Sequence, residues 1–204
     1  MKLYKNLTTA LKERDKVTAI KIVIKDQKFP LELFELPSLE EAYLEGECEH
    51  FPAHISGWKN LKMLSIKWAH FKGDLSAIFS LPKIENFKII ETPLKTFLLP
   101  LGTVAAPLKH LTVKSCNLEK LPEEISMLVH LNEMHLPGNK LTALPFSFQE
   151  LKKLKRLNLD SNQFSQFPDV VKKMPHLGHL SIDSNNFSEE EKARIQREFH
   201  ISPN

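Results

Sequence analysis

A repeat of about 23 residues runs through most of this chain and constrains its fold more than any other feature. The four clearest copies begin at Leu108, Leu131, Leu154 and Leu177, each 23 residues after the one before. Weaker copies begin at Val17, Leu39, Leu61 and Ile84, at intervals of 22 to 24 residues. Units this short cannot each bury their own apolar side chains, so the eight units must stack upon one another into a solenoid.

Each unit has two parts with different periodicity and reads LxxLxLxxNxLxxLPxxhxxLxx, where h is an apolar residue. The first part alternates apolar and polar residues, as in Leu157–Leu159, which predicts a strand with one buried face. The second part places apolar residues at helical spacing, as in Leu144, Phe148 and Leu151, which predicts a helical or 3₁₀ return. A proline fixes φ where the chain leaves the strand side, at Pro30, Pro52, Pro122, Pro145 and Pro168.

This pattern resembles the leucine-rich repeat family over about residues 17–187. The LPxxhxxL half is similar to the intracellular repeats of Ras-suppressor-like and Scribble-like proteins. The resemblance implies a curved α/β solenoid, with parallel strands on its concave face and helical, 3₁₀ or extended turns on its convex face. It also implies that a partner binds to the concave face, and it implies no catalytic activity.

Segments at both ends are expected to cover the core that the first and last units would expose. Near the start, one face of a predicted helix over residues 3–14 carries Leu3, Leu7, Ala10 and Leu11. Near the end, Ser188 and Glu191 have capping-box spacing, and Ile195 and Phe199 form an apolar pair at i, i+4. The prediction is one domain, residues 1–204, divided into a cap (1–16), eight repeats (17–187) and a second cap (188–204).

A ladder of polar side chains is predicted at the turn after each strand. Its members in the last five units are Thr92, Cys116, Asn139, Asn162 and Asn185. A buried amide at this position satisfies backbone groups of its own turn and of the neighbouring turn. Ala69 holds the position in the third unit. We therefore expect the first three units to be less regular than the last five.

Several functional classes are disfavoured by what the composition lacks. The formal net charge of +3 over 204 residues is too small to indicate a nucleic-acid partner. The six glycines form neither GxG nor GxxxxGK, so both nucleotide-binding loops are missing. No stretch is apolar enough for a membrane span or a signal peptide, and two cysteines make no disulfide framework. We expect a cytoplasmic protein with no membrane partner, while a non-standard export route stays open.

A short segment with Cys48, His50 and His54 contains several metal-ligand types. Pro52 disfavours the helix that would bring both histidines to one face, and Cys48 fits the repeat as a small core residue. Cys48 and Cys116 lie three units apart, about 15 Å at ~4.8 Å per strand, which is too far for a disulfide. GxSxG and HExxH are absent. We therefore expect no metal, no cofactor and no enzyme activity.

Strand alternation places three columns of side chains on the concave face. The first column is Ala19, Glu41, Met63, Asn86, His110, Glu133, Arg156 and His179. The central column is Lys21, Tyr43, Ser65, Lys88, Thr112, His135, Asn158 and Ser181. The third column is Val23, Glu45, Lys67, Ile90, Lys114, Pro137, Asp160 and Asp183.

Units two to five gather apolar and cationic side chains in these columns. The predicted partner-binding residues are Tyr43, Lys67, Trp68, Lys88, Ile90 and Lys114. Tyrosine and tryptophan are frequent binding hot spots, although Trp68 could instead fold over the irregular third unit. A nucleic-acid interpretation, with both aromatics as stacking platforms, is disfavoured by the glutamates among the lysines. The sequence thus predicts a protein-binding module, or alternatively a recognition or structural segment of a larger multidomain effector or scaffold protein.

Overall fold

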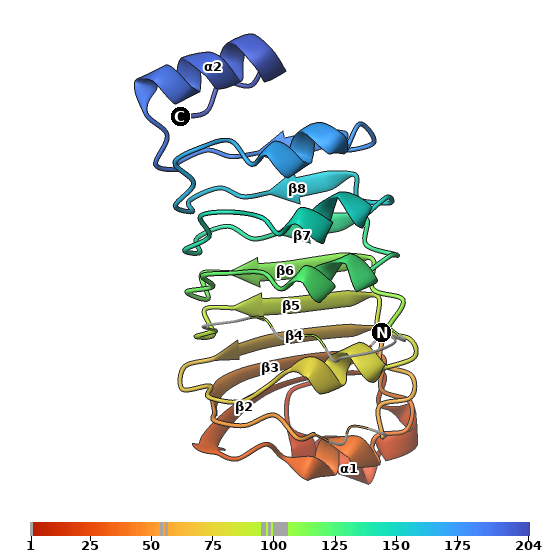
Figure 1. Cartoon of the computed structure of the whole chain (residues 1–204). Coiled ribbons are helices and arrows are strands. Elements are labelled where there is room, and N and C mark those ends of the chain that lie inside the picture. The colour runs from red at the N-terminus through yellow and green to blue at the C-terminus, as the bar shows by residue number, and fades with distance from the viewer. Residues whose placement is uncertain (1, 54, 56, 95–96, 98, 100–105) are drawn as a thin grey trace.

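The computed structural model describes residues 2–53, 55, 57–94, 97, 99 and 106–204, and within them nine parallel strands form one sheet. The strands lie side by side in the order of the sequence, so the chain winds as a curved solenoid (Figure 1). Their bounds are β1 Leu3–Tyr4, β2 Ala19–Gln27, β3 Glu41–Cys48, β4 Met63–Trp68, β5 Asn86–Ile90, β6 His110–Lys114, β7 Glu133–His135, β8 Arg156–Asn158 and β9 His179–Ser181. Strands β2 to β9 come from the eight predicted units, one strand from each.

Short 3₁₀ helices return the chain on the convex side of the sheet (Figure 1). In the repeats they are η2 Leu31–Glu35, η3 Ser76–Ser80, η4 Glu123–Met127, η5 Phe146–Glu150 and η6 Asp169–Lys173. Proline precedes η2, η4, η5 and η6 with φ between −65° and −75°. This confirms that the prolines mark the turn away from the strand side, at four of the five expected positions. The core lies between these returns and the strands, and it contains inward-facing side chains of both, such as Leu111 on β6 and Ile125 on η4.

The N-terminal cap differs from the predicted helix over residues 3–14. Helix α1 covers only Leu7–Lys12 and is followed by a 3₁₀ turn, η1 Arg14–Lys16. Asn6 caps α1 by accepting the Thr9 N–H at 2.9 Å, which fixes the helix start and leaves the preceding residues extended. Those residues form β1, which pairs with the first two residues of β2. Leu3 is therefore exposed on a strand, and Tyr4 is buried instead.

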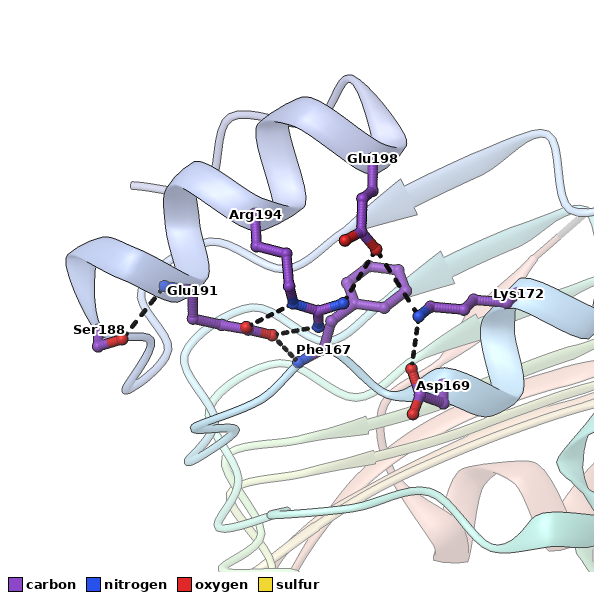
Figure 2. A network of polar contacts seen from close by, with 7 residues as sticks. All are labelled: Phe167, Asp169, Lys172, Ser188, Glu191, Arg194 and Glu198. Carbon is purple, nitrogen blue, oxygen red and sulfur yellow. Dashed lines mark hydrogen bonds and ion pairs between the residues drawn. The ribbon is translucent and has the colours of Figure 1, made fainter.

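The C-terminal cap is helix α2, Glu189–Phe199, which begins after Ser188 as the capping-box spacing predicts. Figure 2 shows the polar network that holds α2 against the seventh unit. The Glu191 carboxylate accepts the Phe167 N–H at 2.8 Å and two hydrogen bonds from Arg194, at 2.6 and 2.7 Å. Ile195 is fully buried, and the ring of Phe199 stacks on Phe167 with centroids 4.1 Å apart.

The ladder residues face inward and bond to the backbone of adjacent turns. Asn139 Oδ1 accepts the N–H groups of Cys116 and Leu118 at 3.0 and 3.1 Å. Its Nδ2 donates to the carbonyls of Val113 and Leu136 at 2.7 and 3.0 Å. The amides of Asn162 and Asn185 make the same kinds of bond one and two units later. One side chain thus satisfies backbone groups of two successive units.

The two other ladder positions hold smaller hydrogen-bonding groups. The Cys116 thiol donates to the Lys114 carbonyl at 3.1 Å, and the Thr92 hydroxyl donates to the Ile90 carbonyl at 3.1 Å. Thr92 Oγ1 also accepts the Trp68 N–H at 2.9 Å. In each of the last five units the residue before the ladder position is left-handed, with φ between 47° and 69°: Glu91, Ser115, Gly138, Ser161 and Ser184.

The first three units are built differently, as the loss of the ladder at Ala69 predicts. Strands β2, β3 and β4 have nine, eight and six residues, whereas β7, β8 and β9 have three each. Six rings fill the space behind these long strands, with ring centroids of contacting pairs 5.0 to 6.5 Å apart. We call these rings the aromatic cluster: Phe29, Phe34, Phe51, Trp58, Trp68 and Phe71.

Candidate partner-binding surface

The strand register aligns the concave columns as predicted. Along the first column Ala19 pairs with Glu41, and the pairing continues strand by strand to His179. The central column runs in the same way from Lys21 to Ser181. Side chains from units 22 to 24 residues apart in sequence are therefore immediate neighbours on one surface.

Apolar side chains are exposed on this surface at its N-terminal end. Val23 is 57% exposed at the third column of β2, and Leu3 is exposed on β1 beside Ala19. Tyr43, Met63 and Ile90 are half-buried on the next strands. Among these residues only Tyr43 and Ile90 were predicted as partner-binding. Leu3 and Val23 were missed, although their place at the edge of the stack leaves them with a neighbour on one side only.

Tyr43 combines an apolar ring with a polar group held in place by its own strand. Its hydroxyl donates to Glu41 Oε2 at 3.0 Å. Partial burial, together with this neighbouring carboxylate, raises the pKa of Tyr43 above its ordinary value. The phenol is therefore a neutral donor at physiological pH, attached to a ring that a partner can cover.

Trp68 does not belong to this surface, and its prediction as a binding residue is wrong. Its side chain is 0% exposed and lies in the aromatic cluster, 5.5 Å from Phe71 and 6.0 Å from Phe51 between ring centroids. Strand β4 extends through Trp68, so the two-residue alternation that points Lys67 outward points the next side chain into the core. Of the predicted site, the concave face keeps Tyr43, Lys67, Lys88, Ile90 and Lys114.

The three predicted lysines differ in their electrostatic surroundings. Lys67 Nζ lies 2.6 Å from Glu91 Oε2, and the same compensation occurs at Lys21, 2.8 Å from Glu45. Within the described part of the chain, the ammonium groups of Lys88 and Lys114 form neither an ion pair nor a hydrogen bond. These two lysines are the cations that remain available to a partner.

The C-terminal half of the concave face is polar, and its charges contact one another. Glu133 Oε2 lies 3.5 Å from both His110 Nδ1 and His135 Nε2, and Glu133 Oε1 lies 3.8 Å from Arg156 Nε. Burial opposes ionisation of Glu133, but the His135 hydrogen bond and the charges of His110 and Arg156 outweigh it. The pKa of Glu133 therefore lies below its ordinary value.

Two aspartates follow this network, each two residues after the end of one of the last two strands. Asp160 Oδ1 accepts hydrogen bonds from the Ser181 hydroxyl (2.6 Å) and the Asp183 N–H (2.8 Å), while Oδ2 accepts from Asn158 Nδ2 at 2.8 Å. Asp183 Oδ1 accepts the Asn204 N–H at 3.0 Å. All of these donors are neutral, so they fix the position of the carboxylates without cancelling their charge.

The cysteines and the possible metal ligands lie away from the concave columns. Cys48 and Cys116 are free, buried thiols, and burial raises the pKa of each to about 11, far from a reactive thiolate. His54, one of the three candidate ligands, lies outside the described residues. Among the residues that are described, no three His, Cys, Asp or Glu side chains gather as a metal site.

Over the same described ranges, no helix has the length and apolar character needed to cross a bilayer.

Comparison with known proteins finds leucine-rich repeats in the C-terminal half of this chain. The model of a leucine-rich repeat region matches residues 104–198. The volume-regulated anion channel subunit LRRC8B of Mus musculus is 30% identical over 123 residues, which are 56% of this chain and 15% of that protein. The chain therefore spans less than a sixth of the length of this relative.

Solved structures share the fold at low sequence identity. A structure of a TLR13–ssRNA13 complex matches 95% of this chain and 29% of its own, with a TM-score of 0.70 and 19% identity. A second structure is the leucine-rich repeat ectodomain of the receptor kinase GASSHO1/SCHENGEN3 from Arabidopsis thaliana in complex with CASPARIAN STRIP INTEGRITY FACTOR 2. It matches 82% of this chain and 20% of its own, with a TM-score of 0.60 and 21% identity. At these identities the likeness supports the architecture alone.

Proposed function

The chain belongs to the leucine-rich repeat family, and on that premise we propose that it is a binding module whose concave face recognises a segment of a partner protein. The proposed centre lies on strands β2 to β6, with Val23, Tyr43 and Ile90 as apolar contacts. Lys88 and Lys114 supply charge. The mechanism is shape complementarity on a rigid parallel sheet, with no covalent chemistry.

The observation that carries this proposal is the gathering of exposed apolar side chains on one end of the concave surface. The strand register places Val23, Tyr43, Met63 and Ile90 on four successive strands, each at least partly exposed. Apolar side chains grouped within a polar surface are typical of interaction sites. The opposite end of the same surface is occupied by charged and amide groups that bond to one another.

A second candidate function is a recognition or structural segment within a larger effector, channel or scaffold protein. The match to a channel subunit along 15% of its length supports this alternative. It differs from the first proposal in what the binding event controls, because the concave surface would serve both. We also propose that the caps meet the repeats at residues 16/17 and 187/188. A cytoplasmic setting, in which both thiols stay reduced, is a further part of the proposal.

Affinity capture from a lysate of the source organism, read by mass spectrometry, tests the surface. One variant carries alanine at Tyr43, Lys67, Lys88 and Lys114. A matched control carries alanine at four exposed residues outside the concave columns, Lys120, Lys140, Phe146 and Lys152. Both variants should remain folded. A protein retained by wild type and by the control, but lost from the concave variant, supports the proposal; equal retention by all three overturns it.

A further inference from the structure

Two positive charges without a partner lie together on strands β5 and β6. The register pairs Lys88 with Thr112 and Ile90 with Lys114, so the two lysines occupy opposite corners of a four-residue patch. No described residue lies within ion-pair distance of either ammonium group. A carboxylate placed over this patch would contact both cations and the side chain of Ile90.

Two negative charges without a cationic partner lie at the other end of the concave face. Asp160 is held by three neutral donors and Asp183 by one. Within the described ranges neither aspartate is in an ion pair. Because the carboxylate of Asp160 is already fixed in position, a cation that binds there does not have to order it.

The surface between these ends is internally neutralised. Glu133 on β7 is surrounded by His110, His135 and Arg156 at 3.5 to 3.8 Å. The concave face is therefore dipolar, with its positive end over β5 and β6 and its negative end after β8 and β9. Three strand spacings separate the two ends, about 14 Å at ~4.8 Å per spacing.

We propose that the partner contributes an extended polypeptide segment that crosses the strands and carries charges opposite to this dipole. Its acidic side chain lies over Lys88 and Lys114, and its lysine or arginine lies over Asp160 and Asp183. An extended chain advances about 3.4 Å per residue, so the two charged residues are separated by about four positions. This inference rests on the proposed function, because it names the chemistry of the partner for the same face.

A polypeptide satisfies both ends of the dipole, whereas a nucleic acid satisfies one. A phosphate backbone would match Lys88 and Lys114 but would then meet Asp160 and Asp183 at the next turns of the solenoid. Like charges placed together in an interface disfavour that partner. The dipole thus selects against a uniformly charged polymer of either sign.

Selection from a displayed library of random 16-residue peptides tests the dipole. The baits are the wild type, a Lys88→Glu/Lys114→Glu variant, an Asp160→Asn variant and a Tyr43→Ala variant. A control, Lys120→Glu/Lys140→Glu, changes exposed lysines outside the columns. Wild type and control should enrich peptides with an acidic and a basic residue three to five positions apart. Loss of the two lysines should weaken these peptides about tenfold, and exchanging the peptide's acidic residue for lysine should restore binding to the Glu variant.

The outcomes separate this inference from the function on which it rests. If Tyr43→Ala abolishes peptide binding but both charge variants bind the same peptides as tightly as the wild type, the dipole is overturned and concave-face binding stays in place. If no peptide is retained, or if the retained peptides bind Tyr43→Ala and both charge variants as tightly as the wild type, concave-face recognition fails and the inference fails with it. Retention of a single-stranded RNA probe through Lys88 and Lys114, with no peptide retained, would assign the face to nucleic acid and overturn both.

Discussion

The first three units and the last three close the turn after each strand in different ways. In units six to eight the turn after each short strand is closed by a buried asparagine that bonds to two successive turns. In units one to three the strands continue through that turn, and backbone pairing does the same work, as in the Gly46–Trp68 pair and the Glu49 N–H to Gln27 carbonyl bond of 3.1 Å. The aromatic cluster fills the volume behind the longer strands. Thr92 joins the two regions by accepting the Trp68 N–H.

The difference extends to the concave surface. The end with long strands and an aromatic interior exposes Val23 and Tyr43, while the end with the asparagine ladder exposes charged and amide groups bonded to one another. A solenoid places interior and surface residues on the same strand, so each unit can vary its outward columns while its inward positions preserve the stack. The exposed apolar side chains at the irregular end are therefore the reason to expect a binding surface there.

Trp68→Ala should have the largest effect on stability, a loss of about 3–5 kcal/mol in the free energy of unfolding. The side chain is fully buried against three rings, so its removal leaves a cavity that the neighbouring strands cannot close. Chemical denaturation of both proteins measures the change. Trp68→Phe should cost much less, because no described residue accepts a hydrogen bond from the indole Nε1. A loss below about 1 kcal/mol for the alanine variant would show that the aromatic cluster does not hold the first units together.

Asn139→Ala should cost about 2–3 kcal/mol, because it leaves the N–H groups of Cys116 and Leu118 buried without their acceptor. Asn186→Ala is the matched control: Asn186 is exposed one residue after a ladder position, and its loss should change stability by less than about 0.5 kcal/mol. Equal losses in the two variants would contradict the role of the ladder.

The two cysteines give each region its own probe of local opening. Cys48 lies in the second unit and Cys116 in the fifth, and both are buried. Labelling with a thiol reagent under native conditions should accelerate mainly at Cys48 in Trp68→Ala and mainly at Cys116 in Asn139→Ala, because neighbouring repeats are coupled more strongly than distant ones. Equal acceleration of both thiols in each variant would mean that the two regions open as one.

Glu191→Gln should have a smaller effect, about 1 kcal/mol at neutral pH, confined to the C-terminal cap. The Arg194 hydrogen bonds lower the pKa of Glu191 in the folded protein. The carboxylate therefore stabilises the fold fully above its unfolded pKa, about 4.3, and this contribution is lost as the pH falls through the folded pKa. Denaturation of both proteins at pH 7 and at pH 3 should show a difference that shrinks at the lower pH. A difference of the same size at both pH values would contradict the ion pair as its source.

The features that repeat could be predicted from the sequence, and those that occur once could not. The columns, the ladder positions and the prolines recur in several units, so each copy supports the assignment of the others. Strand β1 has two residues and no pattern to indicate it, although Asn6 is a recognisable helix cap. Trp68 could have been placed correctly, because two-residue alternation from Ile66 puts it on the core side, where phenylalanines of the first three units converge. The ion pair between Lys67 and Glu91 could not have been predicted, since Glu91 lies outside the columns in a left-handed turn.

Photocrosslinking from two aromatic positions tests the central claim, that the concave face binds the partner, most directly. Tyr43 lies on that face, and Phe146 is 65% exposed in the 3₁₀ return η5 on the convex side. Benzoylphenylalanine at either position should leave the fold intact. In lysate of the source organism, the account predicts a discrete protein adduct from position 43 and none from position 146. The same adduct formed from position 146 alone would place the partner on the convex side and contradict the account.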